Sequence, residues 1–266
     1  MSKFVVVIFP SETAAYEGTR AIKQLHAEGS LTLYGMAVLA REARGNLAIK
    51  QSVDQEGAGL AAGMLVGGLV GLIGGPAGGA LGMGAGALIG GFGDLMNLGI
   101  RSDFIETVTS KLEPGKAAVV AEIDEDWMTP LDIRMEGLSG EVIRQWRSDF
   151  EDEQIEKEVK QEQADLAALK DEFNRANANA KNAVQKRLQE TRAKLEAASK
   201  RADARQRQLE QEAEAKRKEL ERQLAEAKGE IKAKVEQRLA AMKDDHKRRS
   251  QLLKQAWSLT KQALAA

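Results

Sequence analysis

The chain lacks cysteine altogether and has only two histidines and 4 % aromatic residues among its 266 residues. The absence of thiols excludes disulfides and thiolate metal sites and is compatible with a reducing compartment. His26 and His246 lie in different regions and form no cluster of catalytic or metal-ligating residues in the sequence. Because an active site needs several such groups together, the sequence predicts a protein that is not an enzyme and holds no metal or cofactor.

Three weaker signals have simpler explanations. His26 lies near the end of a predicted helix, where it favours the negative helix terminus. The segment 82–86 is glycine-rich like a phosphate-binding loop, but no lysine follows and no strand precedes it. Four carboxylates could offer oxygens to a divalent cation, but they lack the spacing of a calcium loop, and an exposed acidic strand end is the favoured interpretation: Glu122, Asp124, Glu125 and Asp126.

Charge is missing from the thirty-seven residues 57–93, sixteen of which are glycine. Residues four apart share one helix face, and small residues on that face let another backbone approach closely. The sequence therefore predicts an antiparallel glycine-zipper helical hairpin over 57–94, turning at Gly74-Gly75-Pro76. Its packing face is formed by glycines at every fourth position in each arm: Gly59, Gly63, Gly67, Gly71 and Gly75, then Gly78, Gly82, Gly86 and Gly90.

The flanking segments, 1–56 and 95–149, predict an α+β domain. A β-branched run stopped by Pro10 indicates a first strand, and glycines or prolines end most later elements. The expected order is a strand at 4–9, a helix from 11 to 29, strands at 31–40 and 47–52, a helix at 102–112, a strand at 116–123, a helix from 129 to about 137, and a strand at 141–146. The first six match a ferredoxin-like sandwich, whose helices cover one face of the sheet.

The last part, 150–266, is rich in Ala, Glu, Lys, Gln and Arg, and its only aromatic residues are Phe150, Phe173 and Trp257. This composition cannot build a globular core and predicts a long α-helical coiled-coil tail. Asparagines crowd 174–182, where a bend is expected. The tail begins with an acidic run at 151–158 and ends with a basic run at 243–254. Solvated helix faces explain these runs best, although they could also order neighbouring molecules or contact anionic lipid.

Apolar residues recur every eleven positions in the tail, a spacing that gives a nearly straight or slightly right-handed bundle. A continuous helix would reach about 170 Å at about 1.5 Å per residue. The apolar stripe is too narrow for stability alone, so we expect the tail to bundle with other copies. The predicted oligomerisation residues are Leu209, Leu220, Leu224, Ile231, Val235, Met242 and Leu253.

Residues 1–146 resemble domain of unknown function family 1269. The resemblance is carried by residues 3–9, the turn 28–31, the glycine-rich double arm and the segment 112–118 after it. It implies a small α+β domain with a glycine-rich hairpin, described as a bacterial membrane protein without assigned activity. It supplies no catalytic residue, and the helical tail lies outside it.

Two functions remain open. The first is a non-enzymatic, membrane-associated structural protein that assembles with itself, on the cytoplasmic side of the inner membrane, in envelope or stress maintenance. Each hairpin arm has about seventeen residues, or about 25 Å, near the lower limit for spanning about 30 Å of hydrocarbon. The alternative is a soluble homo-oligomeric ring, tube or cage with the hairpins packed inside. The expected partners are copies of the chain and a lipid bilayer, and no small-molecule substrate is expected. Nucleic acid is also not expected, because the net charge is −1 and no basic patch carries aromatics.

Overall fold

The computed structural model describes residues 2–54, 63, 65–70, 100–146 and 150–265. The chain divides into two compact units. The sheet unit comprises Met1–Ser148 and Glu212–Lys243, and the helical unit comprises Asp149–Gln211 and Asp244–Ala266. Among the described residues, no helix combines the length and apolarity needed to cross a membrane.

The sheet unit is built on one antiparallel sheet with the strand order β3-β2-β4-β1-β5. Every residue of β1 and β4 is buried, because these central strands are covered on both faces. All eight elements expected in 1–56 and 95–149 are present: β1 Lys3–Phe9, α1 Glu12–Ala27, β2 Leu31–Arg41, β3 Leu47–Asp54, α4 Ser102–Lys111, β4 Ala117–Glu125, α5 Thr129–Glu136 and β5 Glu141–Trp146.

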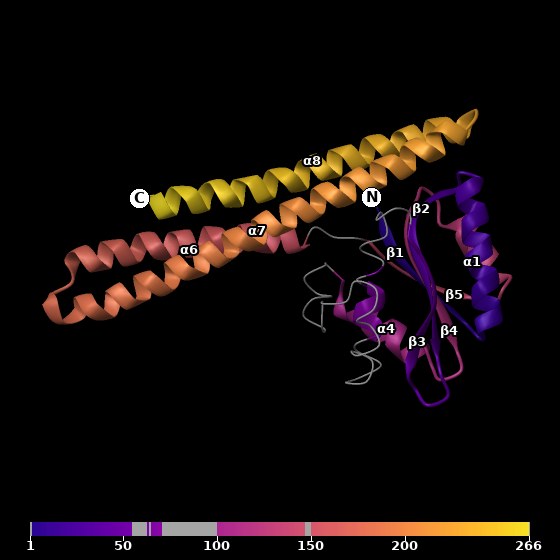
Figure 1. Ribbon diagram of the computed structural model, residues 1–266, viewed down its shortest axis with the longest axis horizontal. Coiled ribbons are helices and arrows are strands. Elements are labelled where there is room, and N and C mark those ends of the chain that lie inside the picture. Colours follow the sequence, from indigo (N-terminus) through magenta and orange to yellow (C-terminus); the bar gives the residue numbers. More distant parts are fainter. Residues whose placement is uncertain (1, 55–62, 64, 71–99, 147–149, 266) are drawn as a thin grey trace. The chain divides into compact units, whose positions relative to one another are not determined.

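Alternate strand residues point to two separate hydrophobic cores. On one face, Val5, Val7 and neighbouring residues pack against α1 and α5. On the other face, Phe4 and Val6 pack against α4, which lies opposite α1 (Figure 1). The first six elements therefore do not place both helices on one face, and this part of the sequence prediction is wrong.

Residues 65–70 are helical and belong to the core on the α4 face. Leu65, Val66, Leu69 and Val70 are at most 4 % exposed. Gly67, on the zipper face, has no described atom within 4 Å of the position that a Cβ would take. One side of this helical segment thus stabilises the sheet unit, and its zipper side has no described residue packed against it.

Of the predicted zipper glycines, Gly63 and Gly67 are described, and the rest lie outside the described residues: Gly59, Gly71, Gly75, Gly78, Gly82, Gly86 and Gly90.

The estimate of about 170 Å assumes that the tail is one continuous helix. The structure shows that it is not. It consists of α6 Phe150–Arg175, α7 Ala178–Glu226 and α8 Glu230–Ala265. The first break lies within the asparagine-rich stretch, and the Asn177 side chain accepts a hydrogen bond from the backbone N–H of Ala180. The second break contains Gly229, whose φ of 56° is in the left-handed region that ends many helices.

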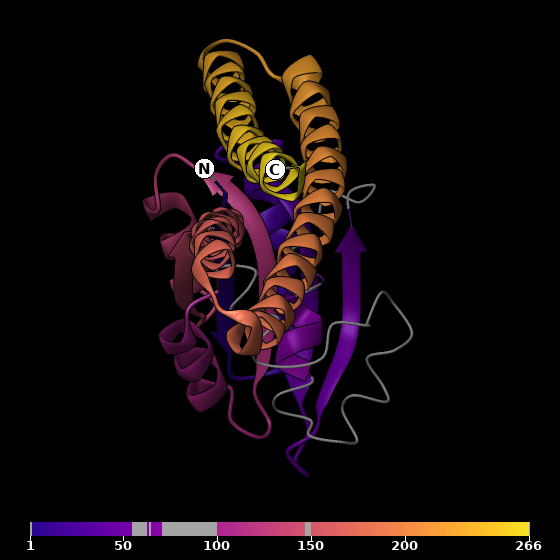
Figure 2. The ribbon, with the colours of Figure 1, turned by 90° about the vertical axis from the view of Figure 1, so that its left-hand side faces the viewer.

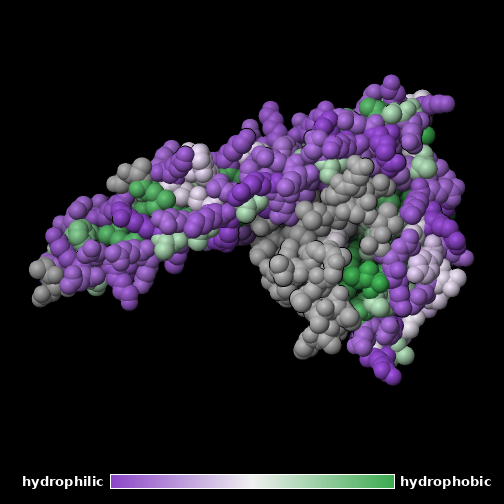
Figure 3. Space-filling view, viewed as in Figure 1, coloured by the Kyte–Doolittle hydropathy of each residue, from purple (hydrophilic) through white to green (hydrophobic). Residues whose placement is uncertain are grey.

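The helical unit consists of α6, the first part of α7 and the last part of α8, which lie side by side (Figures 1 and 2). Leu209 and Leu253 belong to its main apolar cluster. Hydrophilic residues cover most of the helix surface seen in Figure 3. Asp152 is fully buried in this unit, 3.0 Å from Nε of Arg205 and 2.5 Å from Nε of Arg249.

The remainder of α7 and α8, residues 212–226 and 230–243, belongs to the sheet unit. We call these residues the tail tip. Leu220 and Val235 of the tail tip pack with Tyr34 of β2 in one apolar cluster. Although the change in composition at residue 150 suggests a separate tail, the tail tip and the sheet therefore form one compact unit.

Candidate functional site

The end of β4 carries the acidic group that the sequence predicts to be exposed. The prediction is wrong for three of its members, since Glu122, Asp124 and Glu125 are 0, 6 and 5 % exposed. Side chains alternate along a strand, so Glu122 and Asp124 share one face and Glu125 lies on the other. Buried carboxylates need hydrogen bonds or paired cations. No cluster of three or more potential metal ligands occurs in the described part of the chain, and cationic side chains supply the compensation.

Lys216 of α7 is the cation that binds Glu122. Its ammonium group pairs with the Glu122 carboxylate and lies 3.1 Å from the hydroxyl of Ser2. It is also 4.7 Å from the centroid of the Tyr34 ring. Burial and the carboxylates of Asp124 and Glu122 raise the pKa of Tyr34 well above its ordinary value of 10.0, so the phenol stays neutral. Lysine, phenol and carboxylates thus form a buried polar cluster between β4 and the tail tip.

Arg238 of α8 is the second cation and is only 3 % exposed. Its Nη2 is 2.7 Å from Asp126 and donates to the carbonyl oxygens of Gly29 and Ser30, both at 3.2 Å. Gly29 has a φ of 71°, and a Cβ there would lie 2.1 Å from the side chain of Ile231. The close approach of α8 to this turn therefore requires a glycine.

Gln223 of α7 connects the tail tip to the same turn. Its Nε2 donates to the carbonyl oxygens of His26 at 2.8 Å and Leu31 at 2.9 Å, and its Oε1 accepts from the hydroxyl of Thr32 at 2.6 Å. Backbone carbonyls that are buried need such donors. One amide side chain thus satisfies three groups at the end of α1 and the start of β2.

His26 lies near the end of α1, as expected, but its ring also contacts the tail tip. Its Nδ1 accepts a hydrogen bond from the backbone N–H of Leu33 at 3.2 Å, and its Nε2 is 3.0 Å from Glu219. A neutral ring in this position carries its proton on Nε2 and donates it to Glu219. Burial alone would raise the pKa of Glu219, but hydrogen bonds from His26 and Arg222 lower it below its ordinary value of 4.5.

This lowered pKa predicts an acid-sensitive contact. A carboxyl whose pKa is lower in the folded state stabilises that state above its unfolded pKa and loses the effect as the pH falls through the folded value. Stability of the sheet unit should therefore drop below pH 4.5 in the parent chain, and Glu219→Gln should remove part of that drop. Thermal unfolding between pH 7 and 3 measures it. Glu221→Gln on the same helix, at an exposed carboxylate, is the control and should leave the pH dependence unchanged.

A second feature lies on the opposite face of the sheet, at the start of α5. It is an open hollow of about 510 Å³, which we call the Trp hollow, lined by Lys3, Glu125, Asp126, Trp127, Met128, Thr129, Arg144 and Trp146. Oε1 of Glu125 accepts from Nζ of Lys3 at 3.2 Å and from Nε of Arg144 at 2.8 Å. Burial alone would lower the pKa of Arg144, but hydrogen bonds with Glu125 and Asp132 raise it. Hydrogen bonds therefore hold the charged groups of Lys3, Arg144 and Glu125 together in the hollow.

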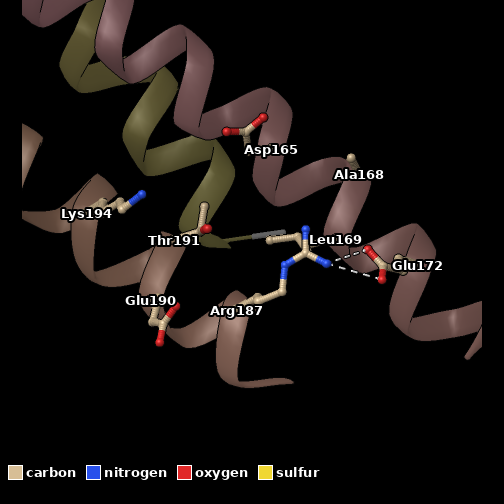
Figure 4. Close-up of a pocket in the computed structure, with 8 residues that line it drawn as sticks. All are labelled: Asp165, Ala168, Leu169, Glu172, Arg187, Glu190, Thr191 and Lys194. Atoms are coloured by element: carbon tan, nitrogen blue, oxygen red, sulfur yellow. Dashed lines mark hydrogen bonds and ion pairs between the residues drawn. The ribbon is translucent and has the colours of Figure 1, made fainter. Parts of the chain in front are cut away.

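The helical unit has a smaller hollow of about 340 Å³ between α6 and α7, lined by Asp165, Ala168, Leu169, Glu172, Arg187, Glu190, Thr191 and Lys194 (Figure 4). Arg187 bonds to both oxygens of Glu172, at 3.2 and 3.3 Å. None of these eight residues has a buried polar atom without a partner. The hollow has the character of a solvated gap between two charged helices.

The seven predicted oligomerisation residues are divided between the two units. Leu209 and Leu253 pack in the helical unit. In the sheet unit, five pack in the cluster around Tyr34: Leu220, Leu224, Ile231, Val235 and Met242. The eleven-residue spacing thus describes apolar contacts within one chain. Oligomerisation through these residues stays a prediction.

Comparisons with known proteins give a family for part of the chain. No curated protein and no solved structure matches it. The family model described as "Protein of unknown function (DUF1269)" matches residues 60–160. This stretch includes the described residues 65–70, α4, β4, α5, β5 and the start of α6. The match confirms the resemblance predicted from the sequence over residues 60–146 and leaves the rest of the helical tail outside, so residues 60–160 are similar to the DUF1269 family.

Proposed function

We propose that this protein is a non-enzymatic, membrane-associated structural protein that assembles with copies of itself. The observation that carries the proposal is the burial of Leu65, Leu69 and Ile100 in one apolar cluster of the sheet unit. These residues lie on either side of 71–99, so the glycine-rich segment is held to the same face of the sheet at both ends. We locate the protein at the cytoplasmic side of the inner membrane, with a role in envelope or stress maintenance.

Residues 65–70 cannot contribute to a membrane span while they stay packed in the core of the sheet unit. The apolar stretch that is free to enter a membrane is therefore shorter than 57–93. Residues 71–93 contain no charge and have Pro76 near their start. With the turn at Gly74-Gly75-Pro76, the arm outside the core is 77–93, seventeen residues or about 25 Å of helix, which is shorter than the hydrocarbon thickness of about 30 Å. We therefore propose that the hairpin enters one leaflet. Its large apolar side chains are Leu72, Ile73, Leu81, Met83, Leu88, Ile89 and Phe92.

Assembly is the second part of the proposal. Gly63 and Gly67 have no described atom within 4 Å of the Cβ position, and a bare helix face admits the backbone of a second helix. We propose that glycine faces of the hairpin pair with each other or with neighbouring copies, and that apolar tail residues add contacts between chains.

A ferredoxin-like description of the sheet also belongs to the proposal. Strands β2, β4, β1 and β5 are adjacent in that order, and α1 and α5 pack on one face. Two split β-α-β units, β1-α1-β2 and β4-α5-β5, fit this order. In this description β3, the glycine-rich segment and α4 form one insertion between β2 and β4.

The soluble ring, tube or cage remains the second candidate. It is favoured by the same burial of Val66 and Val70, because these apolar side chains contact the protein core instead of lipid. In this alternative, the hairpins of several copies would pack together inside an assembly.

Resistance to carbonate extraction separates the two functions. The full chain should sediment with membranes, and a variant with the seven large apolar residues of 71–93 replaced by serine should stay in the supernatant. The variant keeps residues 65–70, so its melting temperature should match that of the parent. Gly67→Leu tests assembly separately and should reduce particle size in detergent. A parent chain that stays in the supernatant as a large particle would contradict membrane attachment and support the soluble assembly.

A further inference from the structure

The Trp hollow contains a buried acceptor that the described residues leave unsatisfied. Both Lys3 and Arg144 bond to Oε1 of Glu125. Among the described residues Oε2 has no hydrogen-bond partner, although the side chain is only 1 % exposed. An unsatisfied buried carboxylate oxygen costs stability. A donor that enters the hollow and reaches this atom would remove the cost.

The four charged side chains that line the hollow are two cations and two anions, Lys3, Arg144, Glu125 and Asp126, and this balance argues against a charged ligand. Three cations are paired with three anions: Lys3, Arg144 and Arg238 with Glu125, Asp126 and Asp132. An anion would meet the open oxygen of Glu125. A cation would meet the ammonium groups of Lys3 and Lys234, which lie 4.3 and 5.1 Å from the centroids of the two tryptophan rings. A neutral ligand with hydroxyl donors avoids both conflicts.

The tryptophans supply apolar surface at the same place. Trp127 and Trp146 are 70 and 58 % exposed, and Met128, which also lines the hollow, is 54 % exposed. Large apolar side chains that gather on a surface mark binding sites, and the volume of about 510 Å³ is in the range of small-ligand sites. Indole rings offer an apolar face to C–H groups and an N–H donor at the edge.

We propose that the Trp hollow binds a saccharide, a neutral ligand that combines many hydroxyl groups with an apolar C–H face. One ligand hydroxyl donates to Oε2 of Glu125, and the C–H face packs on Trp146 and Trp127. This site is formed entirely by the sheet unit and is independent of how the chain meets a membrane.

The test uses the full chain carrying Trp257→Phe, which removes the one tryptophan outside the hollow. Intrinsic fluorescence then reports only Trp127 and Trp146. Titration with maltose, cellobiose and N,N′-diacetylchitobiose should give a saturable change with at least one of them. Because the signal depends on the tryptophans, calorimetry then measures affinity in Trp146→Ala and Trp127→Ala, where each should weaken binding at least about tenfold.

Glu125→Gln should weaken binding as well, and the melting temperature of each variant shows whether the fold is intact. Trp257→Ala is the matched control, since Trp257 also has a lysine 3.7 Å from its ring centroid, and should leave affinity unchanged. The proposal is overturned if none of the three saccharides binds, if folded tryptophan variants bind as well as the parent, or if n-butylammonium or phosphate binds the hollow more tightly than every saccharide.

Discussion

Replacing Lys216 by methionine should destabilise the sheet unit by about 3–5 kcal/mol, the usual cost of leaving one member of a buried ion pair without its partner. Glu122 is fully buried and Lys216 is 6 % exposed, so water cannot replace the lost ammonium group. The change also removes the cation from above the Tyr34 ring. Chemical denaturation gives the free energy, and hydrogen exchange over 212–243 shows whether the tail tip leaves the sheet before the sheet unfolds.

Two further variants separate charge from packing. Lys218→Met changes a lysine on the same helix whose side chain is 60 % exposed, and it should change stability by less than about 0.5 kcal/mol. Lys216→Met combined with Glu122→Met removes both charges and should recover most of the loss, because apolar side chains of similar volume often replace a buried ion pair without loss of stability. Equal destabilisation by Lys216→Met and Lys218→Met would contradict the role of the buried pair.

The elements of the sheet domain could be predicted because local signals are strong there. Val5, Val6 and Val7 form a β-branched run, Pro10 follows it, and Ser11 caps α1 through its hydroxyl. The arrangement of these elements could not be predicted with the same success. Whether α4 covers the face of α1 or the opposite face depends on contacts between residues distant in sequence, and periodicity does not report them.

The docking of the tail tip had a signal that sequence reasoning missed. Gly229 is the only glycine after residue 150, and one glycine in an otherwise helical sequence indicates a helix end. A turn there would have predicted an antiparallel pair of helices, with Leu220 near Val235, in place of a continuous rod. The carboxylates of β4 gave no such signal, because their partners Lys216 and Arg238 lie about 90 to 110 residues away.

The structure also shows that not every charge in the acidic and basic runs of the tail is exposed to solvent. The acidic start and the basic end are best explained from sequence as solvated faces, since most charges on long helices are exposed. Glu153 and Lys254 follow that rule. Asp152 and Arg249 do not, because the antiparallel return of α8 brings them together inside the helical unit. Which charge of a run is buried depends on helix packing, and the sequence pattern alone does not distinguish it.

Replacing Asp152 by asparagine should therefore destabilise the helical unit by about 3–5 kcal/mol. The amide is the same size but removes the carboxylate that binds both Arg205 and Arg249, which are 4 % exposed each. Two guanidinium groups would then repel each other in a poorly solvated position. Circular dichroism melting should show the loss, with a decrease of more than about 10 °C for a unit of this size.

The controls for Asp152→Asn use neighbouring residues. Glu153→Gln changes a carboxylate that is 46 % exposed one residue away, and it should cost less than about 0.5 kcal/mol. Adding Arg205→Met and Arg249→Met to Asp152→Asn should restore stability, since apolar side chains of similar volume often replace a buried ionic group without loss. A triple variant that melts no higher than Asp152→Asn alone would show that packing by the arginine stems, and not charge, holds α6 against α7 and α8.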